Sequence, residues 1–254
     1  MKQKIYGTIL LFAVLSLLLL FGCGPTEEPA LGTYRDGTVV AVSQANERGY
    51  VEVALTIQND EIVDVDIVEF DGLGVAKLYE VYGEVFPQLE DAHNELAQSI
   101  IDQNTWDVDI VSGATSTSEK TRGAAMFALE KARQVQPTVQ YFDGTFMATS
   151  DPTERGWGIA WVTIANDQLV DVTLAGTTPL QEDGEDVFDA AGRQVFTLKT
   201  DDYPWEPYHD AKDMIASEIL RTQSPEVDTF TEATGSSNQW MQAVARAMEN
   251  ARTQ

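Results

Sequence analysis

The 254-residue chain is short of cysteine and of basic residues, and each shortage excludes a class of site or partner. A single cysteine, Cys23, excludes a disulfide within the chain, a zinc site built from cysteines and an iron–sulfur cluster. Only 16 Lys and Arg face 41 Asp and Glu, which gives a formal net charge of −25. Because this charge repels phosphate backbones, nucleic acid is excluded as a partner.

Histidine is equally scarce. His93 and His209 are the only two, and neither has a partner at the spacing of metal ligands. We therefore expect both histidines on the surface, and no metal site. Apolar residues, in contrast, make up 43% of the chain, which is enough to bury a core and argues against global disorder.

The first 22 residues have the composition of an export signal. The basic segment Met1–Lys4 precedes Ile5–Phe21, an apolar run without charge, and polar residues follow from Gly24 onward. The apolar run is nearly long enough to span a bilayer, so a retained transmembrane anchor is the alternative interpretation.

The end of this segment resembles a bacterial lipobox. It reads Leu20-Phe21-Gly22-Cys23, although Phe21 is bulkier than the small residue usual at that position. The resemblance implies that residues 1–22 are a lipoprotein signal peptide, that Cys23 carries the lipid and that residues 23–31 are a lipidated tether. The protein is then expected at the cell membrane, lipid-anchored, with its soluble part on the extracytoplasmic face.

Two parts of the chain repeat one pattern in the same order. Four matches share an offset of 107 residues: Tyr34–Thr38 with Tyr141–Thr145, Glu47–Tyr50 with Glu154–Trp157, Thr56–Asp60 with Thr163–Asp167, and Val63–Val65 with Val170–Val172. A later match, Val108–Thr115 with Val227–Thr234, has an offset of 119, so about twelve extra residues lie within 175–208 of the second copy. We therefore predict two homologous domains, residues 32–133 and 140–254, joined by a linker over 134–139.

Within each copy, strands precede helices. Val51–Ile57 and Ile62–Val68 alternate apolar and polar residues on either side of Asn59-Asp60, which predicts a hairpin. Residues 33–42 supply a preceding strand, and helical spacing covers 90–103 and 118–133. The expected fold is therefore α+β, with a small antiparallel sheet and packed helices in each of two tandem domains.

The polar segment Asp109–Lys120 leads into the last of these helices. Ser116 and Glu119 have the spacing of a capping box, so a well-capped helix after a glycine turn is the structural interpretation. The functional interpretation is a phosphate site, because a helix N-terminus presents unpaired N–H groups and a partial positive charge. Gly113 would let the backbone approach closely, and the flanking hydroxyls, Ser116 among them, would add donors.

The spacing Asp109-x-x-Ser112-Gly113-Ala114-Thr115 resembles the covalent flavin-attachment motif of FMN-binding domains. These domains occur in exported subunits of sodium- and proton-linked redox complexes and in lipoproteins. The resemblance implies FMN as cofactor, joined by a flavin transferase through a phosphoester to Thr115. It also implies that Asp109, Ser112, Gly113 and Ala114 are the recognition residues around this threonine.

The second copy carries a degenerate form of the motif, Asp228-Thr229-Phe230-Thr231-Glu232-Ala233-Thr234. It keeps Asp228, Thr231 and Thr234 but has Glu232 in place of glycine. Glutamate takes positive φ only at a cost and places a carboxylate near the acceptor hydroxyl, so we expect no covalent flavin there. The alternative role for Thr234 is to cap a helix over residues 238–251.

No catalytic residues are expected, because FMN brings its own redox chemistry. The resemblance implies an electron-transfer flavoprotein that exchanges electrons with a membrane redox complex or an exported reductase. Four aromatic residues before the motif could flank the flavin ring or pack in the core: Tyr79, Tyr82, Phe86 and Trp106. The alternative function is that of a non-redox surface lipoprotein which uses the scaffold for binding or structure.

Overall fold

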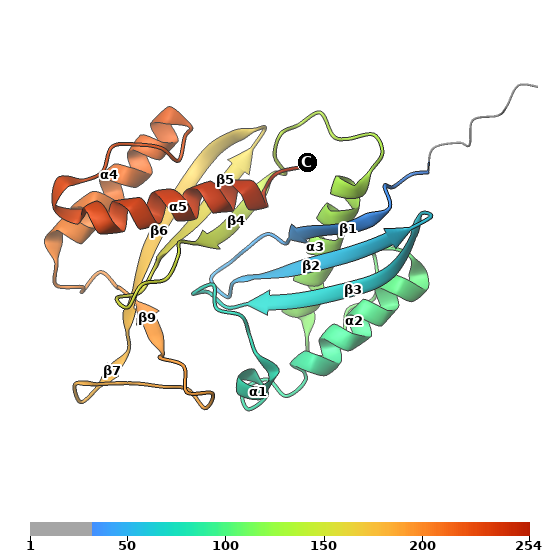
Figure 1. The fold of residues 1–254 in the computed structure, drawn as a ribbon, viewed down its shortest axis with the longest axis horizontal. Coiled ribbons are helices and arrows are strands. Elements are labelled where there is room, and N and C mark those ends of the chain that lie inside the picture. The colour runs from blue at the N-terminus through green and yellow to red at the C-terminus, as the bar shows by residue number, and fades with distance from the viewer. Residues whose placement is uncertain (1–31) are drawn as a thin grey trace, which may run out of the picture. The chain divides into compact units, whose positions relative to one another are not determined.

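The structure is a computed structural model that describes residues 32–254 (Figure 1). The predicted signal peptide, Cys23 and the predicted tether lie outside the described residues. Residues 32–254 form antiparallel sheets with helices packed against them, so the predicted α+β class is confirmed. Between residues 32 and 254, no helix combines the length and apolarity needed to cross a membrane.

The first half forms one sheet followed by three helices. The sheet is antiparallel in the order β1-β2-β3, with strands β1 (Gly37–Val42), β2 (Tyr50–Gln58) and β3 (Glu61–Phe70). The helices are α1 (Tyr79–Tyr82), α2 (Leu89–Gln103) and α3 (Thr115–Ala132). Asn59 and Asp60, with φ of 54° and 65°, form the predicted two-residue hairpin turn between β2 and β3.

The second half repeats this order and adds short strands. Its main sheet has the order β4-β5-β6-β9, with strands β4 (Gly144–Thr149), β5 (Gly158–Ala165), β6 (Gln168–Pro179) and β9 (Phe196–Leu198). A separate hairpin pairs β7 (Gln181–Glu182) with β8 (Glu185–Asp186). The helical elements are α4 (Glu206–Thr222), the 3₁₀ turn η1 (Thr231–Ala233) and α5 (Thr234–Asn250).

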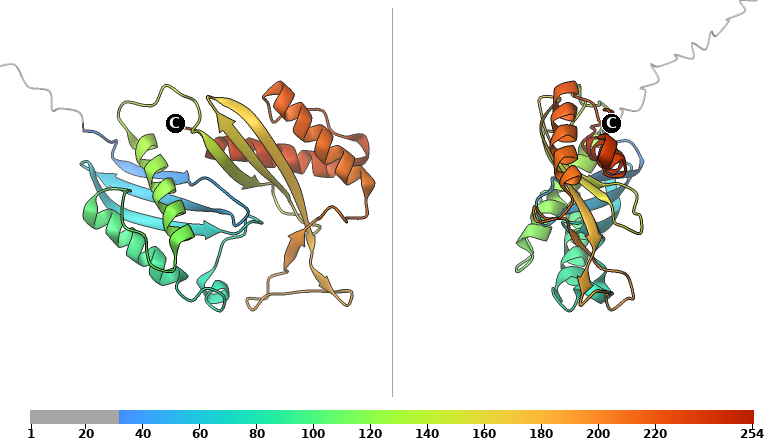
Figure 2. Two further views of the ribbon diagram at one scale, coloured as in Figure 1. Left: turned by 180° about the vertical axis from the view of Figure 1, so that it is seen from behind. Right: turned by 90° about the vertical axis from the view of Figure 1, so that its left-hand side faces the viewer.

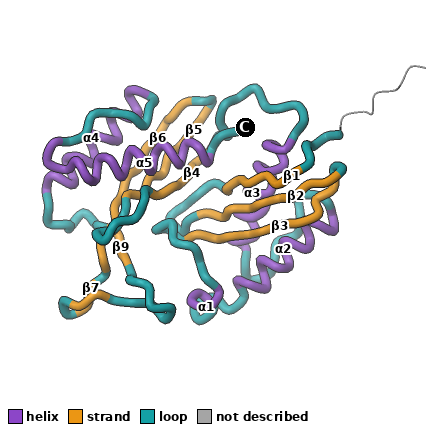
Figure 3. Tube along the Cα trace, in the orientation of Figure 1, coloured by secondary structure: helices purple, strands orange, loops and turns teal. Residues whose placement is uncertain are grey.

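The two halves repeat each other down to single hydrogen bonds. Thr38 and Thr56 lie opposite each other with their hydroxyls 2.9 Å apart, and Thr145 and Thr163 do the same. The register also shifts at the same place in each hairpin, after Thr56 and after Thr163. The extra residues of the second half form the short strands and loops between β6 and α4 (Figure 3).

In each half, two helices pack against the sheet. In the first half, α3 contacts β1 and β2 while α2 contacts β3, as the view from behind in Figure 2 shows. In the second half, α5 contacts β4 and β5 while α4 contacts β6. Alternation along the strands supplies the apolar face; in β2 it buries Val51, Val53, Leu55 and Ile57.

One cluster of buried residues includes side chains from both halves. Phe127 of α3 stacks on Phe142, with ring centroids 4.2 Å apart, and lies 5.8 Å from Phe146 of β4. This contact lies beside the segment proposed as a linker, and the division into two domains at 134–139 stays a prediction.

Candidate functional site

The residues of the first motif lie in the loop before α3 and in its first turn. Ser112, Gly113 and Thr115 are exposed, Ser116 is half-buried and Ala114 is buried. Asp109 is exposed, and its carboxylate makes no hydrogen bond within residues 32–254. Gly113 has a φ of +83°, a conformation that favours glycine, and a Cβ there would lie 2.7 Å from Oε1 of Gln88.

The predicted capping box is wrong. The helix begins at Thr115, so Ser116 lies inside the first turn, and no side chain caps this end. The loop is held by Ser118 instead, whose Oγ donates to the carbonyl of Ala114 at 2.9 Å and accepts from the N–H of Val111 at 3.1 Å. The first-turn N–H groups therefore remain without side-chain acceptors, which leaves them available to an anion.

The Thr115 hydroxyl is also available. It is exposed and makes no hydrogen bond to any described residue, although it is the first residue of α3. Thr234, the first residue of α5, differs: its Oγ1 donates to the carbonyls of Thr231 and Phe230, at 3.2 and 3.4 Å. Of these two threonines, only Thr115 presents a hydroxyl that makes no hydrogen bond to residues 32–254.

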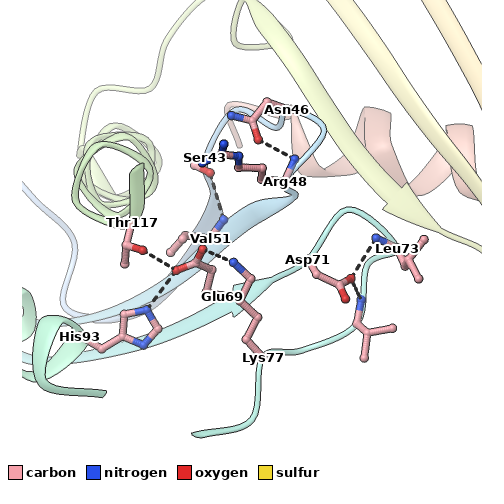
Figure 4. A network of polar contacts seen from close by, with 11 residues as sticks. Ser43, Asn46, Arg48, Val51, Glu69, Asp71, Leu73, Lys77, His93 and Thr117 are labelled. Carbon is pink, nitrogen blue, oxygen red and sulfur yellow. Dashed lines mark hydrogen bonds and ion pairs between the residues drawn. The ribbon is translucent and has the colours of Figure 1, made fainter. Parts of the chain in front are cut away.

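A buried carboxylate lies behind the first turn of α3 (Figure 4). Glu69 of β3 is 3% exposed, and three side chains surround it. Lys77 Nζ lies 2.6 Å from Oε1, Thr117 Oγ1 donates to Oε2 at 2.9 Å, and His93 Nε2 lies 3.5 Å from Oε2. Thr117 belongs to the first turn of α3, so this hydrogen bond ties the motif to the sheet.

The surroundings of Glu69 set its ionisation. Burial by itself raises the pKa of the carboxyl, but the contact with His93, the hydrogen bonds from Lys77 and Thr117 and the charge of Lys77 outweigh it. The net result is a pKa lowered from 4.5 to about 2, so Glu69 is an anion at neutral pH.

The expectation that both histidines lie on the surface is wrong for His93. Its side chain is buried, 3% exposed, and its Nδ1 lies 2.9 Å from the hydroxyl of Tyr79. His93 is in α2, where Leu96 and Ile100 of the same helix turn toward the core. His209 is partly exposed and its Nε2 lies 2.8 Å from the carbonyl oxygen of Tyr203.

Lys120 is the other buried charge beside the motif. It is 7% exposed, and its Nζ has no hydrogen-bond partner among residues 32–254. The pKa of its ammonium is lowered, and burial is the largest cause. The negative charge of Glu69 opposes this lowering, and the positive charge of Lys77 adds to it. Lys120 lies one helical turn beyond Ser116, so an unpaired cation stands close behind the first turn of α3.

These residues fit a cofactor that carries a phosphate. The uncapped helix N-terminus provides N–H donors, Gly113 allows close approach of the backbone, and the Thr115 hydroxyl is free. The ammonium of Lys120 has no hydrogen-bond partner among the described residues, so a bound phosphate could serve as its anion.

Residues 48–130 match the FMN-binding domain family. Residues 48–130 form an FMN-binding domain. FMN is the cofactor of this domain, which contains the whole first motif together with Glu69, Lys77 and Lys120.

No curated protein matches this chain. Among solved structures, the CPE2226 protein from Clostridium perfringens is similar, with 19% sequence identity and a TM-score of 0.35 over 39% of this chain and 88% of that chain.

The charged cluster of the FMN-binding domain was not found from the sequence. One sign of it was available: Val65, Ile67 and Glu69 alternate along β3, and a glutamate at an inward position of such a strand needs buried partners. The identity of those partners depends on contacts between distant segments.

The four aromatic residues before the motif divide into two groups. All are half-buried, but Trp106 packs against the core and lies 5.8 Å from the guanidinium of Arg122. Tyr79, Tyr82 and Phe86 are not part of the core cluster of the described residues. Lys77 Nζ lies 5.1 Å from the Tyr82 ring centroid.

The second motif has a different loop. Asp228, Thr231 and Thr234 are all exposed, and residues 231–233 form the 3₁₀ turn η1. Glu232, also exposed, is absent from the positive-φ residues of the described chain. Glu232 thus avoids positive φ, because the loop tightens into a 3₁₀ turn, and the absence of covalent flavin from this motif stays a prediction.

Proposed function

We propose that this protein is a membrane-anchored, extracytoplasmic flavoprotein that carries FMN covalently on Thr115 and relays electrons. The observation that carries the proposal is the exposed hydroxyl of Thr115 at the uncapped start of α3, inside the FMN-binding domain, where it makes no hydrogen bond to the described residues. A covalent bond suits this location, because a cofactor outside the cytoplasm is lost by dilution once it dissociates.

Attachment requires an activated flavin and a transferase. Oγ1 of Thr115 attacks the phosphorus of a flavin nucleotide whose FMN phosphate is activated as a pyrophosphate. The Oγ1–P bond forms while the P–O bond to the leaving nucleotide phosphate breaks, and the hydroxyl proton passes to a base of the transferase. The flavin is neither oxidised nor reduced in this step.

The chain's part in electron transfer is to hold the cofactor and set its electrostatic surroundings. Bound FMN can pass electrons singly or in pairs, which is chemistry that the cofactor supplies. Lys77 and Lys120 add positive charge near the motif, and the Glu69 carboxylate offsets part of it. The expected partners are a membrane redox complex or an exported reductase.

The decisive experiment uses protein purified from its native source, where the transferase is present. After denaturation and gel filtration, covalent flavin stays with the polypeptide and keeps its yellow absorbance, and the peptide containing Thr115 gains the mass of an FMN phosphoester. Flavin that separates on denaturation would contradict the covalent bond. Native protein without any flavin would favour the non-redox surface lipoprotein.

We predict that Cys23 carries the lipid anchor. Cys23→Ser should abolish partitioning into a detergent phase, because the serine hydroxyl cannot replace the thiol that forms the thioether. The measurement is two-phase detergent partitioning of wild type and variant, with intact mass to count the lipid. A variant that still partitions fully would indicate a retained transmembrane helix.

We predict that the second motif carries no covalent flavin. Thr234 Oγ1 is engaged with backbone carbonyls, and the Glu232 carboxylate lies two residues away in the sequence. Two like charges about 4 Å apart repel by roughly 1 kcal/mol in water and about 4 kcal/mol at an effective dielectric of 20. Intact mass should count one FMN per chain, and a flavin-bearing peptide that contains Thr234 would disprove the prediction.

A further inference from the structure

The second half contains a cavity that no part of the proposed function uses. Its volume is ≈ 760 Å³, which is within the range of small-molecule sites. Its lining includes the basic side chains of Arg155 and Lys199, the aromatic side chains of Tyr203 and Trp205, and residues at the start of α5.

The two cations of this cavity have no ion-pair partner among residues 32–254, unlike Arg193, Arg221, Arg246 and Arg252 of the same half. Lys199 is half-buried, and its pKa is lowered by burial first and by the charge of Arg155 second. Two carboxylates, those of Glu154 and Glu232, also line the cavity, and both are exposed to solvent. The cations therefore repel each other, and a bound anion would offset that repulsion.

A comparison with the FMN-binding domain explains why Lys199 is unpaired. The N–H of Lys77 donates to the carbonyl of Glu69, and the N–H of Lys199 donates to the carbonyl of Gly176, each at 2.8 Å. The two lysines thus occupy corresponding positions, but glycine replaces the buried glutamate that neutralises Lys77. Tyr208 fills the space beside Gly176, with its hydroxyl 3.2 Å from where a Cβ would lie.

Aromatic surface completes the site. The ammonium of Lys199 lies 4.7 Å from the ring centroid of Tyr203, and Trp205 is 41% exposed at the cavity. A partly exposed tryptophan beside unpaired cations suits a flat ring with an anionic group attached. The start of α5 adds backbone N–H donors on the same wall, because no side chain caps that helix.

We propose that this cavity binds a planar aromatic molecule that carries a phosphate, without a covalent bond. The phosphate is held by Lys199 and Arg155, and the ring lies against Trp205. Thr234 stays unmodified, because its hydroxyl donates to backbone carbonyls. The site is separate from Thr115, and the proposal does not depend on the proposed function.

The test is equilibrium dialysis of the full native chain against free FMN, adenosine monophosphate, riboflavin and inorganic phosphate. We expect about one exchangeable equivalent of FMN or of the nucleotide, at least tenfold weaker binding of riboflavin, and competition by inorganic phosphate. The stronger of the two phosphorylated probes identifies the ring. Failure of both to bind, or equal binding of riboflavin and FMN, would overturn the proposal.

Variants assign the binding to this cavity. The double variant Lys199→Gln/Arg155→Gln should weaken the exchangeable site at least tenfold, and Trp205→Ala, at an exposed position, should weaken it severalfold. The matched control Lys212→Gln/Arg193→Gln removes the same charge from the same half outside the cavity, and should change binding less than twofold. An equal loss in both double variants would show nonspecific charge attraction and would refute the site. Flavin that stays on the polypeptide after denaturation reports on Thr115 alone. Failure of the exchangeable site is therefore distinguishable from failure of covalent attachment.

Discussion

Thr115→Val is expected to remove all covalently bound flavin while the fold survives. Valine keeps the β-branched shape of threonine and lacks only the hydroxyl that would form the phosphoester. Because Thr115 is exposed and its side chain makes no hydrogen bond to a described residue, the free energy of unfolding should change by no more than about 0.5 kcal/mol. The measurements are flavin absorbance after denaturation and gel filtration, peptide mass mapping, and thermal unfolding.

Two matched variants make this result specific. Thr115→Ser keeps a hydroxyl at the same place and should retain covalent flavin, whereas Thr234→Val removes the corresponding hydroxyl of α5 and should leave the flavin content unchanged. Flavin that stays on the Thr115→Val variant after denaturation would refute the attachment site. Loss of flavin in the Thr234→Val variant would place the attachment in the other half.

Glu69→Gln is expected to lower the free energy of unfolding by about 3–5 kcal/mol at neutral pH. The substitution keeps the size of the side chain but removes the anion between Lys77 and His93. It leaves the ammonium of Lys77, whose side chain is 13% exposed, without its ion-pair partner. Lys120, which already lacks a hydrogen-bond partner, would lose the nearby negative charge that favours its ammonium. Urea unfolding of both proteins at neutral pH measures the difference.

The pH dependence of this difference has a definite sign. The folded-state pKa of Glu69 is about 2, below the value of 4.5 for an unperturbed carboxyl, so its ionised form stabilises the folded state. That stability is fully present above pH 4.5 and is lost as the pH falls toward 2. The shift corresponds to at most about 3 kcal/mol, so the gap between wild type and variant should narrow by up to this amount over that range.

An exposed ion pair provides the control. Glu249→Gln breaks the pair between Glu249 and Arg252, whose side chains are 69% and 41% exposed, and should cost less than about 1 kcal/mol. Two results would contradict the role assigned to the buried carboxylate. One is a Glu69→Gln variant as stable as the Glu249→Gln variant; the other is a difference in the free energy of unfolding between wild type and Glu69→Gln that stays constant between pH 5 and pH 2.

Local sequence was sufficient for strands β1, β2 and β3, for the turn between β2 and β3 and for the motif, but not for the short strands β7, β8 and β9. The β2–β3 hairpin follows from alternation on either side of Asn59-Asp60, because the pattern selects the buried face and the two turn residues tolerate positive φ. The same local rules predicted the helix after the motif, but they placed its start too late. A capping box needs Ser116 outside the helix, and a hydrogen bond from Ser118 to Ala114 stabilises an earlier start.

The charged cluster around Glu69 and the cavity of the second half were decided only by the tertiary structure. Glu69, Lys77, His93 and Thr117 lie on different segments, and only the packing of α2 and α3 against β3 and its neighbours makes them one network. Lys199 lies among the extra residues, where no sequence match relates it to Lys77. Pairing of β9 with β6 brings Lys199 beside Gly176, and the missing carboxylate there leaves its charge unpaired. Such partners depend on strand register and helix packing over long sequence separations, whereas periodicity, turns and motifs depend on residues that are near neighbours in the chain.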